Sequence, residues 1–130
     1  MSQILKHGLT RVRIPETVRL FPLPDHVLLP DLPVQYRIFE PRYVQLVEDL
    51  LQLPEEERWL AVPKLVPGWK DSTEGEPDYE TIGTLGLLAD ATPIENGEYL
   101  IVVRGLVRSR LYEIPSRSVY RIALVRPIVE

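Results

Sequence analysis

Apolar and polar residues alternate along most of this chain, and helical spacing interrupts the alternation once. Residues 32–39, LPVQYRIF, alternate at the two-residue period of a half-buried strand. Pro41 suits the first turn of a helix, where the N–H that proline lacks would have no partner anyway. The apolar face that follows consists of Tyr43, Leu46, Val47, Leu50 and Leu51. This stretch predicts a strand followed by an amphipathic helix of about three turns.

The other periodic stretches have the two-residue period of strands. We expect strands at residues 18–23, 59–66, 82–91, 99–114 and 119–129. Pro63 predicts that its strand lies at the edge of a sheet, because proline donates no ladder hydrogen bond. Asn96 and Gly97 predict a two-residue hairpin turn, since both central positions of such a turn need a positive φ. Gly105 predicts a bulge or bend that would curl the sheet.

Five to seven strands with one helix inserted early are typical of an α+β fold that is mainly β, here a small barrel. The chain has 130 residues, enough for one core. We expect this domain to span residues 18–130. Residues 1–17 are interpreted as an N-terminal extension with a frayed end. The five prolines between Leu20 and Tyr43 are expected to fix the first strand and the following turn in one register.

Composition narrows the class of protein. Hydrophobic residues make up 45% and charged residues 26% of the chain, which indicates a globular protein rather than a disordered one. No apolar run approaches the ~20 residues that cross a bilayer, and the first residues lack the apolar core of a secretory signal. The absence of cysteine excludes disulfides and thiol chemistry. We therefore expect a cytoplasmic protein without membrane contact, and the net charge of −4 disfavours nucleic acid as a partner.

Side chains that commonly catalyse reactions or bind metals form no recognisable pattern. His7 and His26 are too far apart in sequence to form a helical pair of metal ligands. The acidic residues in the polar loop at residues 67–81 lack the order of a calcium-binding loop, and no glycine-rich phosphate loop occurs. We expect no catalytic residues, no bound metal and no cofactor.

Two groups of residues indicate binding instead. Arg104, Arg108 and Arg110 share strand parity, so they would project from one side of the sheet unless a bulge at Gly105 shifts the register. This strip is the candidate site for an anion or for RNA, and an ordinary solvent-exposed strand face is the simpler explanation. The candidates for contact with apolar peptide segments, unless they cover the ends of the barrel, are Leu28, Leu29, Trp69 and Tyr79.

Three stretches resemble the Lon substrate-binding domain family. "LFPLPDHVLLPDLPVQYRIFEPRY" resembles the opening of that domain, and "VPGWKDSTEGEPDYETIGTLG" resembles a loop and returning strand of its stand-alone bacterial members. "ENGEYLIVVRGLVRSRLYE" is similar to their hairpin and following strand. The resemblance implies a PUA-like pseudo-barrel with one principal helix after the first strands, in agreement with the β pattern. The ATPase and Ser-Lys protease motifs of full-length Lon are absent from this sequence.

The resemblance implies a non-enzymatic module that binds unfolded or extended polypeptide, by analogy with the presentation of substrates to Lon. Its partners would be such polypeptides, together with a protease or another protein. Two alternatives stay open. PUA-like barrels often bind RNA, which the arginine strip could contact through phosphates. An adaptor domain that recognises one folded partner would show the same sequence features.

Overall fold

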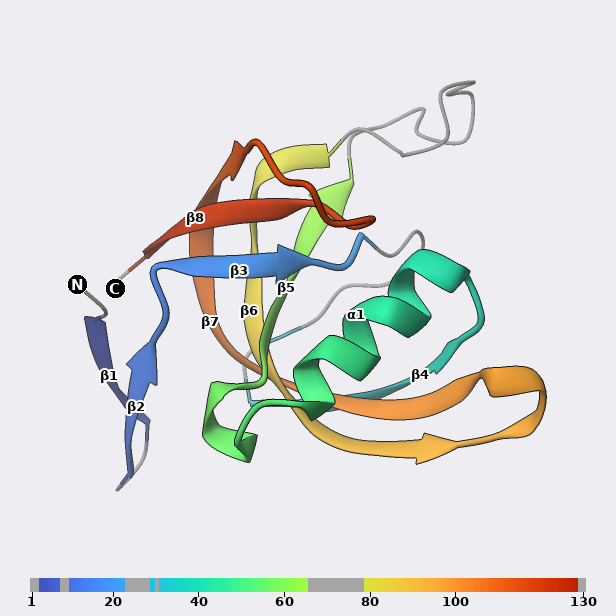
Figure 1. The fold of residues 1–130 in the computed structure, drawn as a ribbon. Helices are drawn as coiled ribbons and strands as arrows, with labels where there is room; N and C mark the ends of the chain where they lie inside the picture. The colour runs from blue at the N-terminus through green and yellow to red at the C-terminus, as the bar shows by residue number, and fades with distance from the viewer. Residues whose placement is uncertain (1–2, 8–9, 23–28, 30, 66–78, 129–130) are drawn as a thin grey trace.

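A computed structural model of the chain describes residues 3–7, 10–22, 29, 31–65 and 79–128. This part of the chain contains one α-helix and eight strands (Figure 1). In chain order they are β1 (Gln3–His7), β2 (Thr10–Ile14), β3 (Thr17–Leu20), β4 (Pro33–Ile38), α1 (Pro41–Leu51), β5 (Trp59–Leu65), β6 (Tyr79–Pro93), β7 (Tyr99–Ile114) and β8 (Ile122–Pro127). The fold class is α+β and mainly β, as the sequence predicts.

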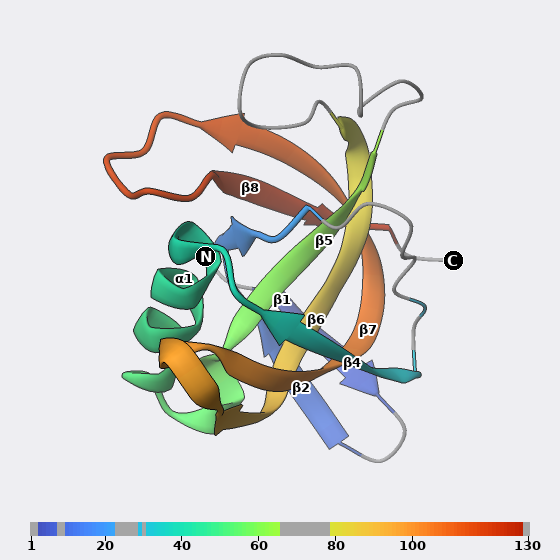
Figure 2. The ribbon, with the colours of Figure 1, turned by 90° about the vertical axis from the view of Figure 1, so that its right-hand side faces the viewer.

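Five of these strands close into a barrel. β7, β6, β5, β3 and β8 are neighbours in that order, and β8 pairs again with β7. The pairing is antiparallel except between β3 and β5, which run parallel. β4 pairs with the first half of β7 and stands outside the ring. Figures 1 and 2 show α1 lying along the outside of the barrel.

The barrel wall separates two apolar cores. The inner core fills the barrel and consists of Ile14, Val18, Leu20, Trp59, Ala61, Leu85, Leu106, Val107, Leu111 and Ala123. The outer core lies between the wall, β4 and α1 and consists of Phe21, Tyr36, Ile38, Tyr43, Leu46, Val47, Leu50, Leu60, Val62, Leu88, Ile101, Val103 and Tyr120. Alternate side chains of β5 enter the two cores, because successive residues of a strand point to opposite faces.

The helix begins where its pattern predicts. Glu40 has extended backbone and precedes Pro41, the first helical residue. The buried residues are Tyr43, Leu46, Val47 and Leu50, and the fifth predicted residue, Leu51, is partly buried against the outer core. The apolar face of α1 therefore covers the wall of the barrel. No helix among the described residues is both long and apolar enough to cross a membrane.

An aromatic cluster joins β3, β4 and α1. Phe21 follows β3 and packs edge-on against Tyr36 of β4, with ring centroids 5.7 Å apart. The ring of Phe21 also lies 4.9 Å from that of Tyr43 on α1. The proline-rich stretch thus begins and ends at rings that meet in the outer core.

The turn between β6 and β7 has the predicted positive φ values, but it is one residue longer than the predicted two-residue turn, because Ile94 donates its N–H to the carbonyl oxygen of Glu98 at 2.9 Å. Asn96 and Gly97 have φ values of 60° and 72°. Glu98 donates its N–H to the carbonyl oxygen of Glu95 at 3.1 Å, which closes the turn. Both positive φ values that the Asn-Gly pair predicts are confirmed, and the hairpin arms are long.

β7 contains a bulge next to Gly105. Leu85 of β6 lies opposite Val107, but the next residue, Gly86, lies opposite Gly105. Leu106 is therefore an extra residue in β7. A single extra residue exchanges the faces on which the residues before and after it project.

β5 is not an edge strand, so the prediction from Pro63 is wrong. β5 pairs with β6 on one side and with β3 on the other. The pairing with β3 reaches only Leu60 and Ala61, so Pro63 lies beyond its end. The register with β6 also shifts between Pro63 and Leu65. An interior strand accommodates the proline because no ladder hydrogen bond is needed at that point.

The interpretation of residues 1–17 as a frayed extension also needs correction. β1 and β2 form an antiparallel hairpin, with Gln3 opposite Ile14. Ile14 is buried in the inner core, and Thr17 already begins β3. The described part of this segment is therefore folded and attached to the barrel through an apolar side chain.

Candidate functional site

Within the part of the chain that the structure describes, β4 is the strand of the six-stranded sheet that has a neighbour on one side only. Gly105 of β7 donates its N–H to the carbonyl oxygen of Leu32 at 3.3 Å. Because hydrogen bonding alternates along an antiparallel ladder, the N–H groups of Gln35 and Arg37 face away from β7. They are directed toward the free edge.

Exposed apolar side chains flank this edge. Leu32 immediately precedes β4 and is 51% exposed, and Phe39 immediately follows it and is 61% exposed. Leu29, one of the residues predicted to contact peptide, is 42% exposed. Single exposed apolar residues are ordinary, but these lie at the two ends of a strand that has one neighbour among the described strands. We call β4 with Leu29, Leu32 and Phe39 the β4 edge.

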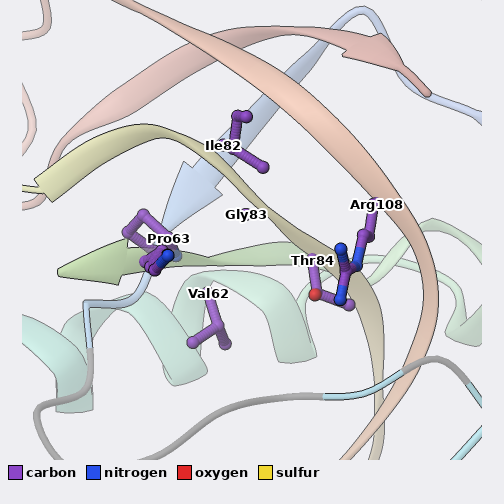
Figure 3. A pocket seen from close by; sticks show the side chains of 7 residues that line it. Val62, Pro63, Ile82, Gly83, Thr84 and Arg108 are labelled. Atoms are coloured by element: carbon purple, nitrogen blue, oxygen red, sulfur yellow. The ribbon is translucent and has the colours of Figure 1, made fainter.

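A cavity of about 300 Å³ lies on β5, β6 and β7 (Figure 3). Val62, Thr84 and Arg108 lie opposite one another on the three strands and form one row across it. The cavity is also lined by Pro63, Lys64, Ile82 and Gly83. Its walls are largely aliphatic, and Lys64 and Arg108 add positive charge. A site of this kind suits an apolar group with a negative charge beside it.

The three predicted arginines are all exposed, but they do not share a face. Arg104 lies opposite Leu87, which packs against the inner core. Arg108 lies opposite Thr84, on the face that points away from the inner core. The bulge in β7 therefore separates Arg104 from Arg108 and Arg110, the effect considered for Gly105 in the sequence.

A residue that sequence reasoning missed completes the arginine group. Arg126 of β8 lies directly opposite Arg110, and both are exposed. The next pair on the same face of these strands is Tyr112 and Leu124, which are 45% and 44% exposed. We call Arg108, Arg110, Arg126, Tyr112 and Leu124 the β7–β8 face. Strand parity alone could not predict this face, because the register between β7 and β8 determines which residues lie opposite one another.

The remaining candidates are not placed in a site. Leu28, Trp69 and His26 lie outside the described residues. Tyr79 opens β6, but its side chain also lies outside the description, as does that of His7 in β1. Among the described residues, no group of three or more His, Cys, Asp or Glu could hold a metal ion.

Hydrogen bonds through Tyr120 connect the helix to the barrel. The Tyr120 hydroxyl donates to the carboxylate of Asp49 on α1 and accepts from Nε of Arg19 on β3 at 3.1 Å. Burial raises the pKa of Tyr120 above its ordinary value of 10.0, and donation to Asp49 raises this pKa further, whereas Arg19 lowers it. The fold therefore favours the neutral phenol.

We expect this phenol to make the domain less stable at alkaline pH. Because its pKa is higher in the folded state, its contribution is complete below pH 10.0 and is lost as the pH rises through the folded-state pKa. In urea unfolding between about pH 9 and 11, the free energy of unfolding should fall more steeply for the wild type than for Tyr120→Phe, by up to about 1.4 kcal/mol per pH unit. Parallel pH profiles for the two proteins would contradict the expectation.

The barrel with its outer helix belongs to a recognised class. A family model described as the ATP-dependent protease La (LON) substrate-binding domain matches residues 17–130. The match includes the barrel strands, β4 and α1. The chain belongs to the Lon substrate-binding domain family, which confirms the resemblance seen in its sequence.

Individual relatives agree with this assignment. A Lon protease of Desulfosudis oleivorans is 28% identical over 101 residues, which are 78% of this chain and 12% of that protein. A Lon N-terminal domain protein from Xanthomonas campestris has a TM-score of 0.65 and 24% identity, covering 87% of this chain and 60% of that one. The N-terminal domain of a Mycobacterium avium complex Lon protease has a TM-score of 0.64 and 15% identity, covering 88% and 55%. The two structures share the fold, and the chain spans only a small part of the full protease.

Proposed function

We propose that this chain is a non-enzymatic recognition module that binds unfolded or extended polypeptide. The observation that carries the proposal is the β4 edge, a strand with one side unpaired among the described residues and with exposed apolar residues at its ends. Membership of a substrate-binding family supports protein substrates as the ligands and a protease as the context. The chain's similarity is to a binding domain and not to the catalytic parts of that protease.

An extended segment placed beside β4 would continue the sheet. The outward N–H groups of Gln35 and Arg37 would donate to its backbone, which every polypeptide carries regardless of sequence. Leu32 and Phe39 would bury apolar side chains of the segment at the two ends of the strand. Binding through one short edge should be weak and tolerant of sequence, as recognition of many unfolded substrates requires.

The proposal predicts that an uncharged extended peptide binds and that one backbone N–H decides its affinity. As a probe we choose the synthetic peptide SVTVSVTVS, blocked at both ends and labelled with a fluorophore. Its affinity, measured by fluorescence anisotropy, should change little as salt is raised, because apolar burial and backbone hydrogen bonds are screened far less than ion pairs. Gln35→Pro should weaken binding by about tenfold, the effect of losing roughly 1.4 kcal/mol.

Gln35→Ala is the matched control, because it removes the same side chain but keeps the N–H. Pro33 already occupies β4 two positions earlier, so a proline whose missing N–H faces the free edge should not disturb the ladder with β7. Equal affinities of Gln35→Pro and Gln35→Ala would refute the β4 edge as the site. Absence of binding to the wild type at any salt concentration would refute strand addition to β4 as the way this chain recognises polypeptide.

A further inference from the structure

Two arginines face each other across β7 and β8. Arg110 and Arg126 are directly opposite each other. The Cβ atoms of residues in this position are roughly 5 Å apart. Arg108 precedes them on the same face. Within the described residues, none of the three guanidinium groups has an ion pair or a hydrogen bond. Like charges in this position destabilise a sheet, so a bound anion would relieve a repulsion built into the fold.

Apolar sites lie on both sides of these arginines along β7. On one side, Ile82 lies opposite Arg110 and Val62 lies in the row of Arg108, at the cavity of about 300 Å³. On the other side, Tyr112 and Leu124 border a second cavity of about 420 Å³. Successive rows of one strand face are about 6.8 Å apart, which is also the spacing of alternate side chains in an extended peptide.

We propose that the β7–β8 face, with a cavity at each end, binds an extended polypeptide segment in which acidic residues stand between apolar residues. The carboxylates would pair with Arg108, Arg110 and Arg126, whose guanidinium groups can bind carboxylates with two parallel hydrogen bonds. The flanking apolar side chains would enter the two cavities. This inference goes beyond the proposed function, because it concerns another surface and holds whether or not β4 accepts a strand.

The ends of this surface favour a polypeptide over single-stranded nucleic acid. Sites for single strands combine a basic groove with several aromatic rings on which bases stack. Among the described residues that line the two cavities, Tyr112 is the one aromatic side chain, and aliphatic residues and prolines predominate.

The test measures binding of the labelled synthetic peptide SLSESESFS, blocked at both ends, to the full chain by fluorescence anisotropy at low and at physiological salt. We expect measurable affinity that falls as salt rises. The same peptide with Gln in place of Glu, or with Ser in place of Leu and Phe, should bind about tenfold more weakly or worse. Arg110→Glu should weaken the parent peptide similarly while raising the melting temperature, because the introduced carboxylate would form an opposite-charge pair with Arg126.

Arg104→Glu is the matched control, since it makes the same charge change on the same strand but on the other face. Its affinity for the peptide should stay within about twofold of the wild type, a change of roughly 0.4 kcal/mol. If Arg110→Glu impairs folding, Arg126→Gln tests the same surface, because it removes one of the proposed arginine–carboxylate pairs from β8. Equal losses in Arg104→Glu and Arg110→Glu, no loss in Arg126→Gln, or tighter binding of a nine-nucleotide oligouridine than of the peptide would overturn the proposal.

Discussion

Leu50→Ala should lower the free energy of unfolding by about 2–5 kcal/mol. Leu50 has no exposed surface and lies on the face of α1 that packs into the outer core. Truncation removes buried methyl groups and leaves a cavity, because the helix cannot move inward without displacing the rest of its apolar face. Urea unfolding monitored by far-ultraviolet circular dichroism measures the loss directly.

Gln45→Ala is the comparison on the same helix. Gln45 is exposed, and its side chain donates to Asp49 at 2.8 Å. The loss of this surface hydrogen bond costs a few tenths of a kcal/mol, and the higher helix propensity of alanine offsets part of it. Similar unfolding midpoints for the two variants would mean that α1 does not pack as described.

Gly83→Ala should cost about 3 kcal/mol or more, because the side chain has no space. A Cβ atom at this position would lie 2.6 Å from the carbonyl oxygen of Val62, 2.7 Å from Cα of Pro63 and 2.9 Å from Cδ1 of Leu111. Two of these atoms belong to the backbone of β5 and cannot rotate away. β5 and β6 would have to separate, which weakens the wall of the barrel and deforms the cavity beside it.

Gly97→Ala separates this effect from the conformational freedom of glycine. Gly97 has φ of +72°, but nothing lies within 4 Å of a Cβ built there. Its substitution should therefore cost only the strain of a positive φ, about 1 kcal/mol. Thermal unfolding should rank the proteins wild type, Gly97→Ala and Gly83→Ala in decreasing stability. The reverse order of the two variants would rule out the close approach of β5 and β6.

Local patterns predicted the local elements. The helix with Leu46 and Leu50 on its buried face, and the turn at Asn96 and Gly97, depend on residues within a few positions of one another. The closure of the barrel depends instead on residues that are far apart in the chain. β3 joins β5 in parallel and β8 in antiparallel pairing, and no periodicity within one segment states which distant segment is its neighbour. The prediction from Pro63 was wrong for the same reason. An interior strand tolerates a proline at this position because the pairing with β3 ends before it.

The candidate sites were predictable only in part. Strand parity predicted that Arg104, Arg108 and Arg110 share a face, but the extra residue in β7 divides them between two faces. The position of Arg126 opposite Arg110 follows from the register between β7 and β8. The β4 edge follows from the strand order. No local pattern indicates that, among the described strands, β4 has one neighbour and the strand of Pro63 has two.

The barrel can close only late in synthesis, because β3 pairs with β8 near the end of the described chain. Arg19 and Tyr120 form a hydrogen bond although they are 101 positions apart. β3 leaves the ribosome early, yet its antiparallel partner β8 is among the last described segments to be translated. Until β8 has emerged, the barrel wall around the inner faces of β3 and β5 is incomplete. The conformational entropy that is lost when such distant segments come together is compensated only once β8 pairs. The growing chain therefore leaves apolar strand faces uncovered until residue 127 has emerged.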